Sequence, residues 1–393
     1  MSERNLLMIP GPIEFDPAVL RAQARPTLGH TSAEFIEIFG RTLDRLREVF
    51  LSPAGQPFVV AGSGTLAMEI AVCNLVEPGD KVLVVDHGYF GARMATIASR
   101  YTANVMTITA PVGNVVSLEQ VEEALDRERP KVMAVTQVDT STGVRADVRN
   151  LARLAREHGA LSIVDGVCAT AAEEFRQDEW EVDVCLTASQ KAISVPPGLA
   201  LLMVSPRALE AQRARRTPVA NYFGDFSQWL PVMQAYQSRK PAYFGTPPVN
   251  LIYALDVSVE QMLAQGMEAR FAWHRTIGEA FQAAARALGL SEVPARPELA
   301  SVAMSAWFYP EGLRPGFLAE AGKRGVVLAG GLHPQIRDRY FRIGHMGPIT
   351  RGDVLAAIGA IEGAFEAVGY RIEIGAGVAA AAQALASGEM AHA

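Results

Sequence analysis

Two apolar runs of this chain are separated by the stretch Thr187-Ala188-Ser189-Gln190-Lys191-Ala192-Ile193-Ser194-Val195-Pro196-Pro197-Gly198. The runs cover residues 182–186, interrupted by Asp183, and residues 199–204. Because two prolines and a glycine end the stretch, the pattern predicts strand, loop and strand, with Lys191 in the loop. An ammonium group between buried strands is poorly solvated, which favours the neutral amine that condenses with an aldehyde as a Schiff base. For this stretch alone, a surface-loop lysine is the alternative.

The composition predicts a soluble cytoplasmic protein. The chain has 393 residues, 49% of them hydrophobic, and a formal net charge of −6, so it can bury a large core and is expected to form two domains. The sequence contains no basic run, so nucleic acid is not expected as a partner. Three widely spaced cysteines (Cys73, Cys168 and Cys185) show neither metal-ligand spacing nor a disulfide framework. The first residues lack the layout of a signal peptide, and the alanine-rich stretch 375–386 is too short to span a bilayer, so no membrane is expected.

Residues 62–65, Gly-Ser-Gly-Thr, lie between an apolar run and a predicted helix. A small, hydroxyl-bearing turn that enters a helix directs unpaired amides and the positive end of the helix dipole at one point, which is how many proteins hold phosphate. No Gly-Lys-Ser/Thr follows, so this is not a Walker loop. A simple helix N-cap at Ser63 is the alternative.

The chain alternates predicted strands and helices, which indicates an α/β fold with a largely parallel sheet. Strands are expected at 81–85, 104–109, 131–136 and 161–165, and capping boxes are expected to open helices at Thr31 and Ser117. Ligands of such sheets collect beyond the carboxyl ends of the strands. Several polar or aromatic residues fall at these ends: Ser63, Phe90, Ser141, Asp165 and Lys191.

The pattern changes after about residue 249, where a long helix gives way to helices and shorter strands at 302–308 and 340–344. We therefore predict a large domain over residues 19–262. A smaller α+β domain is predicted to combine residues 1–18 with residues 263–393.

Asp165 ends an apolar strand, where a carboxylate is costly unless a cation pairs with it. A pyridinium nitrogen is such a cation, and the pairing makes the ring a better electron sink. A helix N-cap is the alternative for Asp165. Together, a strand-end aspartate, a later loop lysine, a Ser-Gly phosphate turn and an aromatic residue indicate pyridoxal 5′-phosphate.

The chain resembles the class V, fold-type I pyridoxal-phosphate aminotransferases, specifically the alanine/serine–glyoxylate aminotransferase group. The resemblance rests on motifs in the family's order: Pro10-Gly11-Pro12, Leu28-Gly29-His30, Gly62-Ser63-Gly64-Thr65, Ser141-Thr142-Gly143, Val164-Asp165-Gly166-Val167, Ser189-Gln190-Lys191 with Pro196-Pro197-Gly198, and Arg342-Ile343-Gly344. It implies a mainly parallel seven-stranded sheet between helices in the large domain, and a smaller α+β C-terminal domain.

The resemblance also assigns the site residues. Lys191 carries the cofactor and then moves the substrate proton, Asp165 holds the pyridine nitrogen, and Val167 and Phe90 pack on opposite ring faces. The phosphate-binding positions are Ser63, Gly64, Thr65 and Gln190, and Ser141 contacts the polar edge of the cofactor. Tyr243 and Thr246 match residues that reach the phosphate of the neighbouring subunit, which implies a homodimer. Arg342, with Gly11, matches the site of the substrate carboxylate, for which a planar guanidinium is suited; a surface salt bridge is the alternative for this arginine.

Three residues near these motifs stay open. Ile13 stands where the family commonly has threonine, so a contact there must come from the backbone. Gly166 replaces a common serine, with no consequence that the sequence reveals. His345 is interpreted as structural, with a place at the pocket edge as the alternative.

The function predicted from this resemblance is a ping-pong transaminase that takes the amino group from alanine or serine and gives it to glyoxylate or a similar small 2-oxo acid. A single substrate arginine, Arg342, favours small uncharged side chains. Same-fold alternatives are 2-aminoethylphosphonate–pyruvate, ureidoglycine–glyoxylate and pyridoxamine–pyruvate transamination. A cysteine desulfurase is not expected, because Gln190 replaces the histidine of that group and no cysteine follows Cys185. A non-enzymatic protein of this fold would lack Lys191 or Asp165, and a hydrolase would need a Gly-x-Ser-x-Gly elbow at a strand end.

Overall fold

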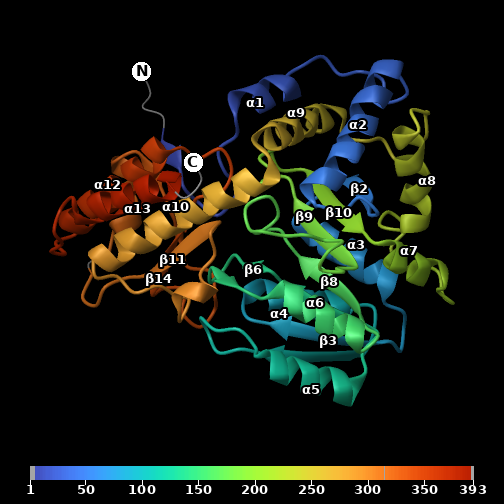
Figure 1. The fold of residues 1–393 in the computed structure, drawn as a ribbon, viewed down its shortest axis with the longest axis horizontal. Helices are drawn as coiled ribbons and strands as arrows, with labels where there is room; N and C mark the ends of the chain where they lie inside the picture. Colours follow the sequence, from blue (N-terminus) through green and yellow to red (C-terminus); the bar gives the residue numbers. More distant parts are fainter. Residues whose placement is uncertain (1–4, 314, 391–393) are drawn as a thin grey trace.

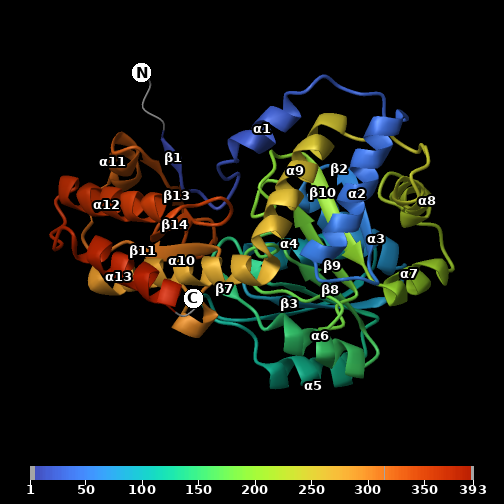
Figure 2. The same ribbon diagram turned by 45° about the horizontal axis from the view of Figure 1, so that its top comes forward.

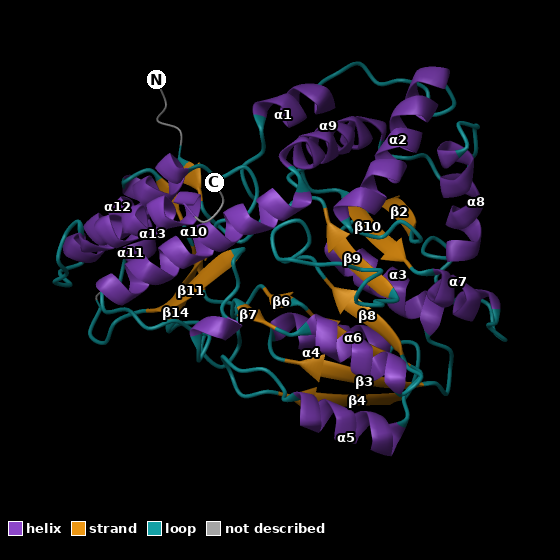
Figure 3. Ribbon diagram, in the orientation of Figure 1, coloured by secondary structure: helices purple, strands orange, loops and turns teal. Residues whose placement is uncertain are grey.

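The computed structural model describes residues 5–313 and 315–390, and its centre is a seven-stranded sheet (Figures 1 and 3). The strand order is β2, β10, β9, β8, β5, β3, β4. Their bounds are β2 Gln56–Ala61, β3 Lys81–Asp86, β4 Asn104–Thr109, β5 Val132–Thr136, β8 Leu161–Asp165, β9 Val184–Ala188 and β10 Leu199–Val204. Only β10 runs antiparallel to its neighbours. The mainly parallel sheet predicted from the sequence is therefore confirmed.

Helices cover both faces of this sheet. The chain passes from β3 through α4 (Tyr89–Ala98) outward to β4, and from β4 through α5 (Leu118–Glu128) back to β5. Because right-handed crossovers in opposite directions place their helices on opposite faces, α4 and α5 lie on different sides of the sheet. α3 (Gly64–Leu75) packs beside α4, and α6 (Val148–Glu157) packs beside α5 (Figure 2).

A second group of helices closes the side of the sheet near β2 and β10. α2 (Ala33–Val49) packs on α9 (Val249–Gln265), α8 (Phe226–Gln237) and β2, and α1 (Pro17–Gln23) packs on α9. α7 (Pro206–Arg213) contacts α3. The short strands β6 (Val138–Asp139) and β7 (Val144–Arg145) form a hairpin after β5.

The C-terminal part has a hydrophobic core of its own. Its antiparallel sheet consists of β11 (Met304–Phe308), β14 (Tyr340–Gly344) and β13 (Ala329–Gly330). The helices are α10 (Met267–Ala287), the 3-10 helix η1 (Pro297–Leu299), α11 (Phe317–Lys323), α12 (Arg351–Ala367) and α13 (Ala376–Met390). Phe281, Trp307, Phe341 and Phe365 are among the side chains of this core. Near the N-terminus, β1 (Leu6–Leu7) pairs with β12 (Val326–Val327), so the first described residues join this part of the molecule. The domain bounds at 18/19 and 262/263 stay a prediction.

Most local signals of the sequence are found in the structure, with one correction. Ser117 and Gln120 form the expected capping box of α5. The predicted box at Thr31 is wrong by one residue, because Ser32 is the N-cap of α2 and accepts a hydrogen bond from the Phe35 amide. Across the described ranges, we find no helix with the length and apolar character that a membrane span requires.

Candidate active site

The carboxyl ends of the central strands open onto a cavity of about 450 Å³. Its walls contain all of the site residues predicted from the sequence except Ser141, Tyr243 and Thr246. The lining residues that match the prediction are Gly11, Ser63, Gly64, Thr65, Phe90, Asp165, Val167, Gln190, Lys191 and Arg342. Residues from distant parts of the sequence, including β14 of the C-terminal sheet, therefore converge on one space.

Lys191 lies in the loop between β9 and β10, as predicted, and it is 6% exposed. Its Nζ donates hydrogen bonds to the carbonyl oxygen of Pro10 and to Oγ1 of Thr140 (3.2 Å), and it lies 3.9 Å from Sγ of Cys168. Burial lowers the pKa of the Lys191 ammonium group. A surface lysine is therefore the wrong interpretation, and the neutral, nucleophilic amine is favoured.

Gly11 allows the N-terminal turn to approach this lysine. A Cβ at Gly11 would lie 2.8 Å from Cδ and Cε of Lys191, and the glycine φ is +110°. Both the space and the backbone conformation therefore require glycine.

Asp165 ends β8 and is 1% exposed. Its Oδ1 accepts a hydrogen bond from the Val167 amide (2.9 Å), and it forms no ion pair with a described lysine or arginine. Burial raises the pKa of Asp165 to about 7. No helix begins in the fully described segment between β8 and β9, so the N-cap alternative is wrong. A buried carboxyl without a cation is a place where a cationic ring nitrogen would be stabilised.

The Gly-Ser-Gly-Thr turn begins α3. Ser63 is the N-cap, and its hydroxyl accepts a hydrogen bond from the Leu66 amide (3.3 Å). A Cβ at Gly64 would lie 2.9 Å from Cγ2 of Val167, so glycine lets the helix start against the residue that follows Asp165. The N-cap interpretation is correct, and the positive end of α3 also faces the cavity beside the exposed Thr65. The two roles are compatible.

Asp139 fixes the segments around Phe90 and Ser141 and was not singled out from the sequence. This fully buried residue of β6 accepts hydrogen bonds from the amide of Phe90 (2.8 Å) and from the amide (2.8 Å) and hydroxyl of Ser141. Oγ of Ser141 in turn accepts a hydrogen bond from the Tyr89 amide (3.1 Å). Ser141 is thus buried behind the cavity wall rather than on it. The available signal was an aspartate directly before a hydroxyl-rich turn, where it bonds the backbone two residues on.

Arg342, on β14, reaches the cavity from the C-terminal sheet. Its Nε donates to the carbonyl oxygen of Gly330 (2.8 Å) and its Nη1 to that of Thr140 (3.1 Å). It makes no salt bridge with a described carboxylate, so the salt-bridge alternative is wrong. Burial lowers the pKa of the guanidinium group, which remains a fixed cation at neutral pH. A partly buried arginine held only by carbonyl oxygens is well suited to bind a carboxylate.

Tyr243 and Thr246 do not enter the cavity of their own chain. Both are exposed, Tyr243 by 65%, in the loop between α8 and α9. His345 is fully buried, bonds the Ser305 hydroxyl (3.0 Å) and stacks on Phe281. This agrees with the structural interpretation of His345.

The structure bears on the two departures from the family pattern. Ile13 is buried in the main core, and its amide donates to the carbonyl oxygen of Gln190 (3.2 Å). Because Ile13 does not line the cavity, the backbone contact expected at this position stays a prediction. A Cβ at Gly166 would lie 2.4 Å from Oγ1 of Thr170 and 3.1 Å from Sγ of Cys185. A serine could therefore not be accommodated at position 166 without moving Thr170 or Cys185.

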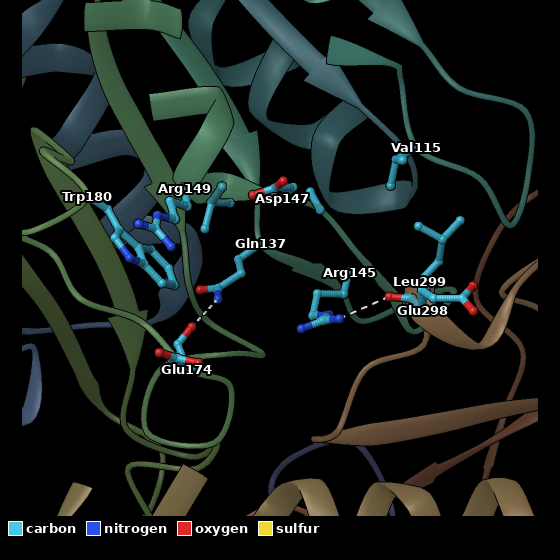
Figure 4. A pocket seen from close by; sticks show the side chains of 11 residues that line it. Val115, Gln137, Arg145, Asp147, Arg149, Glu174, Trp180, Glu298 and Leu299 are labelled. Atoms are coloured by element: carbon cyan, nitrogen blue, oxygen red, sulfur yellow. Dashed lines mark hydrogen bonds between the residues drawn. The ribbon is translucent and has the colours of Figure 1, made fainter. Parts of the chain in front are cut away.

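A second cavity, of about 370 Å³, lies apart from these residues (Figure 4). Arg145 donates a hydrogen bond across it to the carbonyl oxygen of Glu298 (3.0 Å), and Gln137 donates to that of Glu174 (3.1 Å). None of the predicted site residues lines it. The candidate active site is therefore the cavity that contains Lys191.

Comparison with known proteins shows the family of the chain. Residues 19–306 match the family model described as aminotransferase class-V. The chain is 39% identical to alanine–glyoxylate aminotransferase 1 of Saccharomyces cerevisiae, covering 87% of this chain and 92% of that protein. It is 35% identical to L-aspartate–glyoxylate aminotransferase of Paracoccus denitrificans, covering 97% and 96%. The crystal structure of pyridoxamine–pyruvate aminotransferase from Mesorhizobium loti superposes with a TM-score of 0.92 at 28% identity and covers 98% of both chains.

Proposed function

Because the chain belongs to the class-V aminotransferase family, we propose that it is a pyridoxal-phosphate-dependent transaminase that uses a ping-pong mechanism. Its amino donor is L-alanine or L-serine, and its acceptor is glyoxylate or a similar small 2-oxo acid. The observation that carries this proposal is the convergence of Lys191, Asp165 and Arg342 on one cavity.

The residues of the cavity fit the cofactor. When bound, pyridoxal phosphate supplies an aldehyde that takes up the amino group and a ring that accepts the electron pair released at the substrate carbon. The buried Asp165 carboxyl, which lacks a cation, would hold the ring nitrogen. The start of α3 would hold the phosphate, and Phe90 and Val167 would contact the ring.

Each protein group then has a chemical task. Arg342 binds the substrate carboxylate through its planar guanidinium group and orients the α-carbon. The Lys191 amine, whose pKa is lowered by burial, removes the proton from that carbon and returns it to the other reacting carbon. Ionised Asp165 would hold the protonated ring nitrogen of the bound cofactor and so favour its action as an electron acceptor.

The donor class follows from the rest of the lining. The lining also contains apolar residues, namely Ile9, Ala329 and Leu332. A small neutral side chain can be buried there at little cost, whereas a second carboxylate would need its own cation. The alanine donor in the name of the yeast relative agrees with this choice, and the aspartate donor in that of the Paracoccus relative makes L-aspartate the competing donor to test.

We also propose a homodimer in the cytoplasm, with Tyr243 and Thr246 reaching the cofactor phosphate of the partner. Both residues are exposed and do not line the cavity of their own chain. Tyr222 and Phe223 add exposed aromatic surface nearby in sequence. The three cysteines are free and buried, which is compatible with a reducing compartment. The large domain would span residues 19–262.

The absorption spectrum of the purified protein with bound cofactor tests the function. L-alanine, L-serine, L-aspartate, 2-aminoethylphosphonate and pyridoxamine are added separately, and glyoxylate is then added to complete the cycle. We expect L-alanine or L-serine to bleach the visible band and glyoxylate to restore it. A response to another donor alone would overturn the substrate class, and a protein that forms no band with added cofactor would overturn the proposed function.

A further inference from the structure

We propose that Arg93 is the residue that binds the phosphate group of the cofactor through a fixed positive charge. This inference rests on the proposed function, because it assigns a role toward the cofactor of that same site. Neither the sequence motifs nor the resemblance drew attention to Arg93.

Arg93 lies at the edge of the phosphate turn. It is on α4, and its Nη1 donates a hydrogen bond to Oγ1 of Thr65 (3.0 Å), the threonine of the Gly-Ser-Gly-Thr turn. Its guanidinium carbon lies 4.8 Å from the ring centroid of Phe90 and 5.1 Å from that of Tyr89. Arg93 therefore joins the turn that is predicted to hold the phosphate to the aromatic residue that is predicted to contact the ring.

Arg93 places its charge against the rings of Phe90 and Tyr89. It forms no ion pair with a carboxylate of the described residues, although it lines the cavity. Arg207, by contrast, is paired with Asp183 (2.8 Å). An unpaired guanidinium group beside a helix N-terminus provides what a phosphate dianion requires, namely full positive charge and several N–H donors.

The other two cations of the cavity are engaged elsewhere. Lys191 bonds Pro10 and Thr140, and Arg342 bonds Gly330 and Thr140. Both therefore lie against the wall formed by Thr140, whereas Arg93 is bonded to the phosphate turn. Without Arg93, no lysine or arginine among the described residues lining the cavity would be bonded to that turn.

The test compares a ligand that has the phosphate with one that lacks it. Cofactor is removed from the wild-type protein and from the variants Arg93→Gln, Arg93→Lys and Arg153→Gln. The last variant removes an exposed arginine of α6 that is paired with Glu157, so it controls for the loss of one charge. Pyridoxal 5′-phosphate and pyridoxal are titrated into each protein, and the dissociation constants are measured by absorption.

We expect Arg93→Gln to weaken binding of pyridoxal 5′-phosphate by about 10- to 100-fold, the effect of losing a charge-assisted hydrogen bond, and to change pyridoxal binding by less than about twofold. Arg93→Lys keeps the charge and should lie between Arg93→Gln and the wild type, and Arg153→Gln should bind both ligands like the wild type. Equal weakening of both ligands would overturn the inference, because it would show that Arg93 only supports the fold around Phe90.

Three further results separate the remaining possibilities. Unchanged affinity for pyridoxal 5′-phosphate together with a raised KM for L-aspartate alone would also overturn the inference, and it would assign Arg93 to the distal carboxylate of an acidic donor. A wild-type protein that binds neither ligand would overturn the proposed function, and this inference with it. If the wild-type protein and the Arg93→Gln variant bind the cofactor equally well, only the role of Arg93 is overturned.

Discussion

The substitution Asp165→Asn is expected to stabilise the protein without cofactor and to weaken cofactor binding. The carboxyl is buried and forms no ion pair with the described residues, so burial destabilises its ionised form when the cofactor is absent. Asparagine keeps a carbonyl oxygen that can accept the hydrogen bond from the Val167 amide. It carries no charge, so it removes the cost of ionisation but cannot pair with a pyridinium nitrogen.

The magnitude follows from the pKa. Burial raises the pKa of Asp165 from 3.8 to about 7. Between about pH 4 and pH 7, Asp165 is protonated in the folded chain but ionised in the unfolded chain. The free energy of unfolding therefore falls as the pH rises through this range. At about 1.36 kcal/mol per pKa unit, ionised Asp165 costs roughly 4 kcal/mol at pH 8. With an unfolding entropy of about 2.1 cal/mol/K per residue over 393 residues, this free energy corresponds to about 5 °C in the thermal midpoint.

The assay is thermal unfolding of the cofactor-free proteins at pH 5 and pH 8, at one protein concentration. The variant should unfold at a higher temperature than the wild type at pH 8, and the difference should shrink at pH 5. Adding pyridoxal 5′-phosphate should raise the midpoint of the wild type more than that of the variant. Asp256→Asn is the matched control, because this buried aspartate is paired with Arg41 and Arg45, and its loss should lower the midpoint.

The reasoning would be refuted by a variant that unfolds at or below the wild-type temperature at pH 8 while Asp256→Asn behaves as expected. Such a result would mean that Asp165 is stabilised by its surroundings before any cofactor binds. If the cofactor stabilises the wild type and Asp165→Asn equally, the proposed pairing of Asp165 with the ring nitrogen is wrong.

Three further substitutions test the proposed roles of single residues. Lys191→Ala should fold and bind cofactor weakly, without the visible band, and transamination at the wild-type rate would show that another group moves the proton. Arg342→Ala should raise KM for the amino acid roughly 30- to several-thousand-fold, because binding free energy on the order of 2–5 kcal/mol for the substrate carboxylate is lost. An unchanged KM in steady-state kinetics would place the carboxylate site elsewhere. Asp139→Asn should weaken cofactor binding by about tenfold or more. The substitution replaces the charged acceptor of the Phe90 and Ser141 amides by a neutral one, and hydrogen bonds to a charged group contribute about 1.5–3 kcal/mol. The exposed Asp126→Asn is its control, and equal affinity of the two variants for the cofactor would argue against a positioning role for Asp139.

The elements around Lys191 could be predicted because their signals are local. The run at 199–204 coincides with β10, and Pro196 and Gly198 end the loop before it. The run at 182–186 was placed less well, since β9 begins at Val184. Asp183 explains the difference: its carboxylate pairs with Arg207 and accepts from the Ser162 amide, so it anchors the strand entry instead of continuing the strand.

Residues whose roles depend on tertiary contacts could not be found in this way. Asp139 acts on Phe90, 49 positions earlier, and Arg93 on Thr65, 28 positions earlier. In sequence both are ordinary polar residues, one near a turn and one in a helix. Gly166 is a similar case, because only the packing of Thr170 and Cys185 shows why a side chain is excluded there.

The role of Arg93 also decides how the choice of donor should be understood. The sequence argument for a small neutral donor counted one arginine, yet the cavity contains two. With the proposed roles, a cofactor phosphate and one substrate carboxylate would together occupy both Arg93 and Arg342, and no third arginine lines the cavity among the described residues. A dicarboxylic donor would then have to bury its distal carboxylate against apolar side chains such as Leu332, which is costly without a partner. The proposed preference for L-alanine or L-serine thus depends on Arg93 being committed to the phosphate, so the binding experiment on this arginine bears on the substrate as well as on the cofactor.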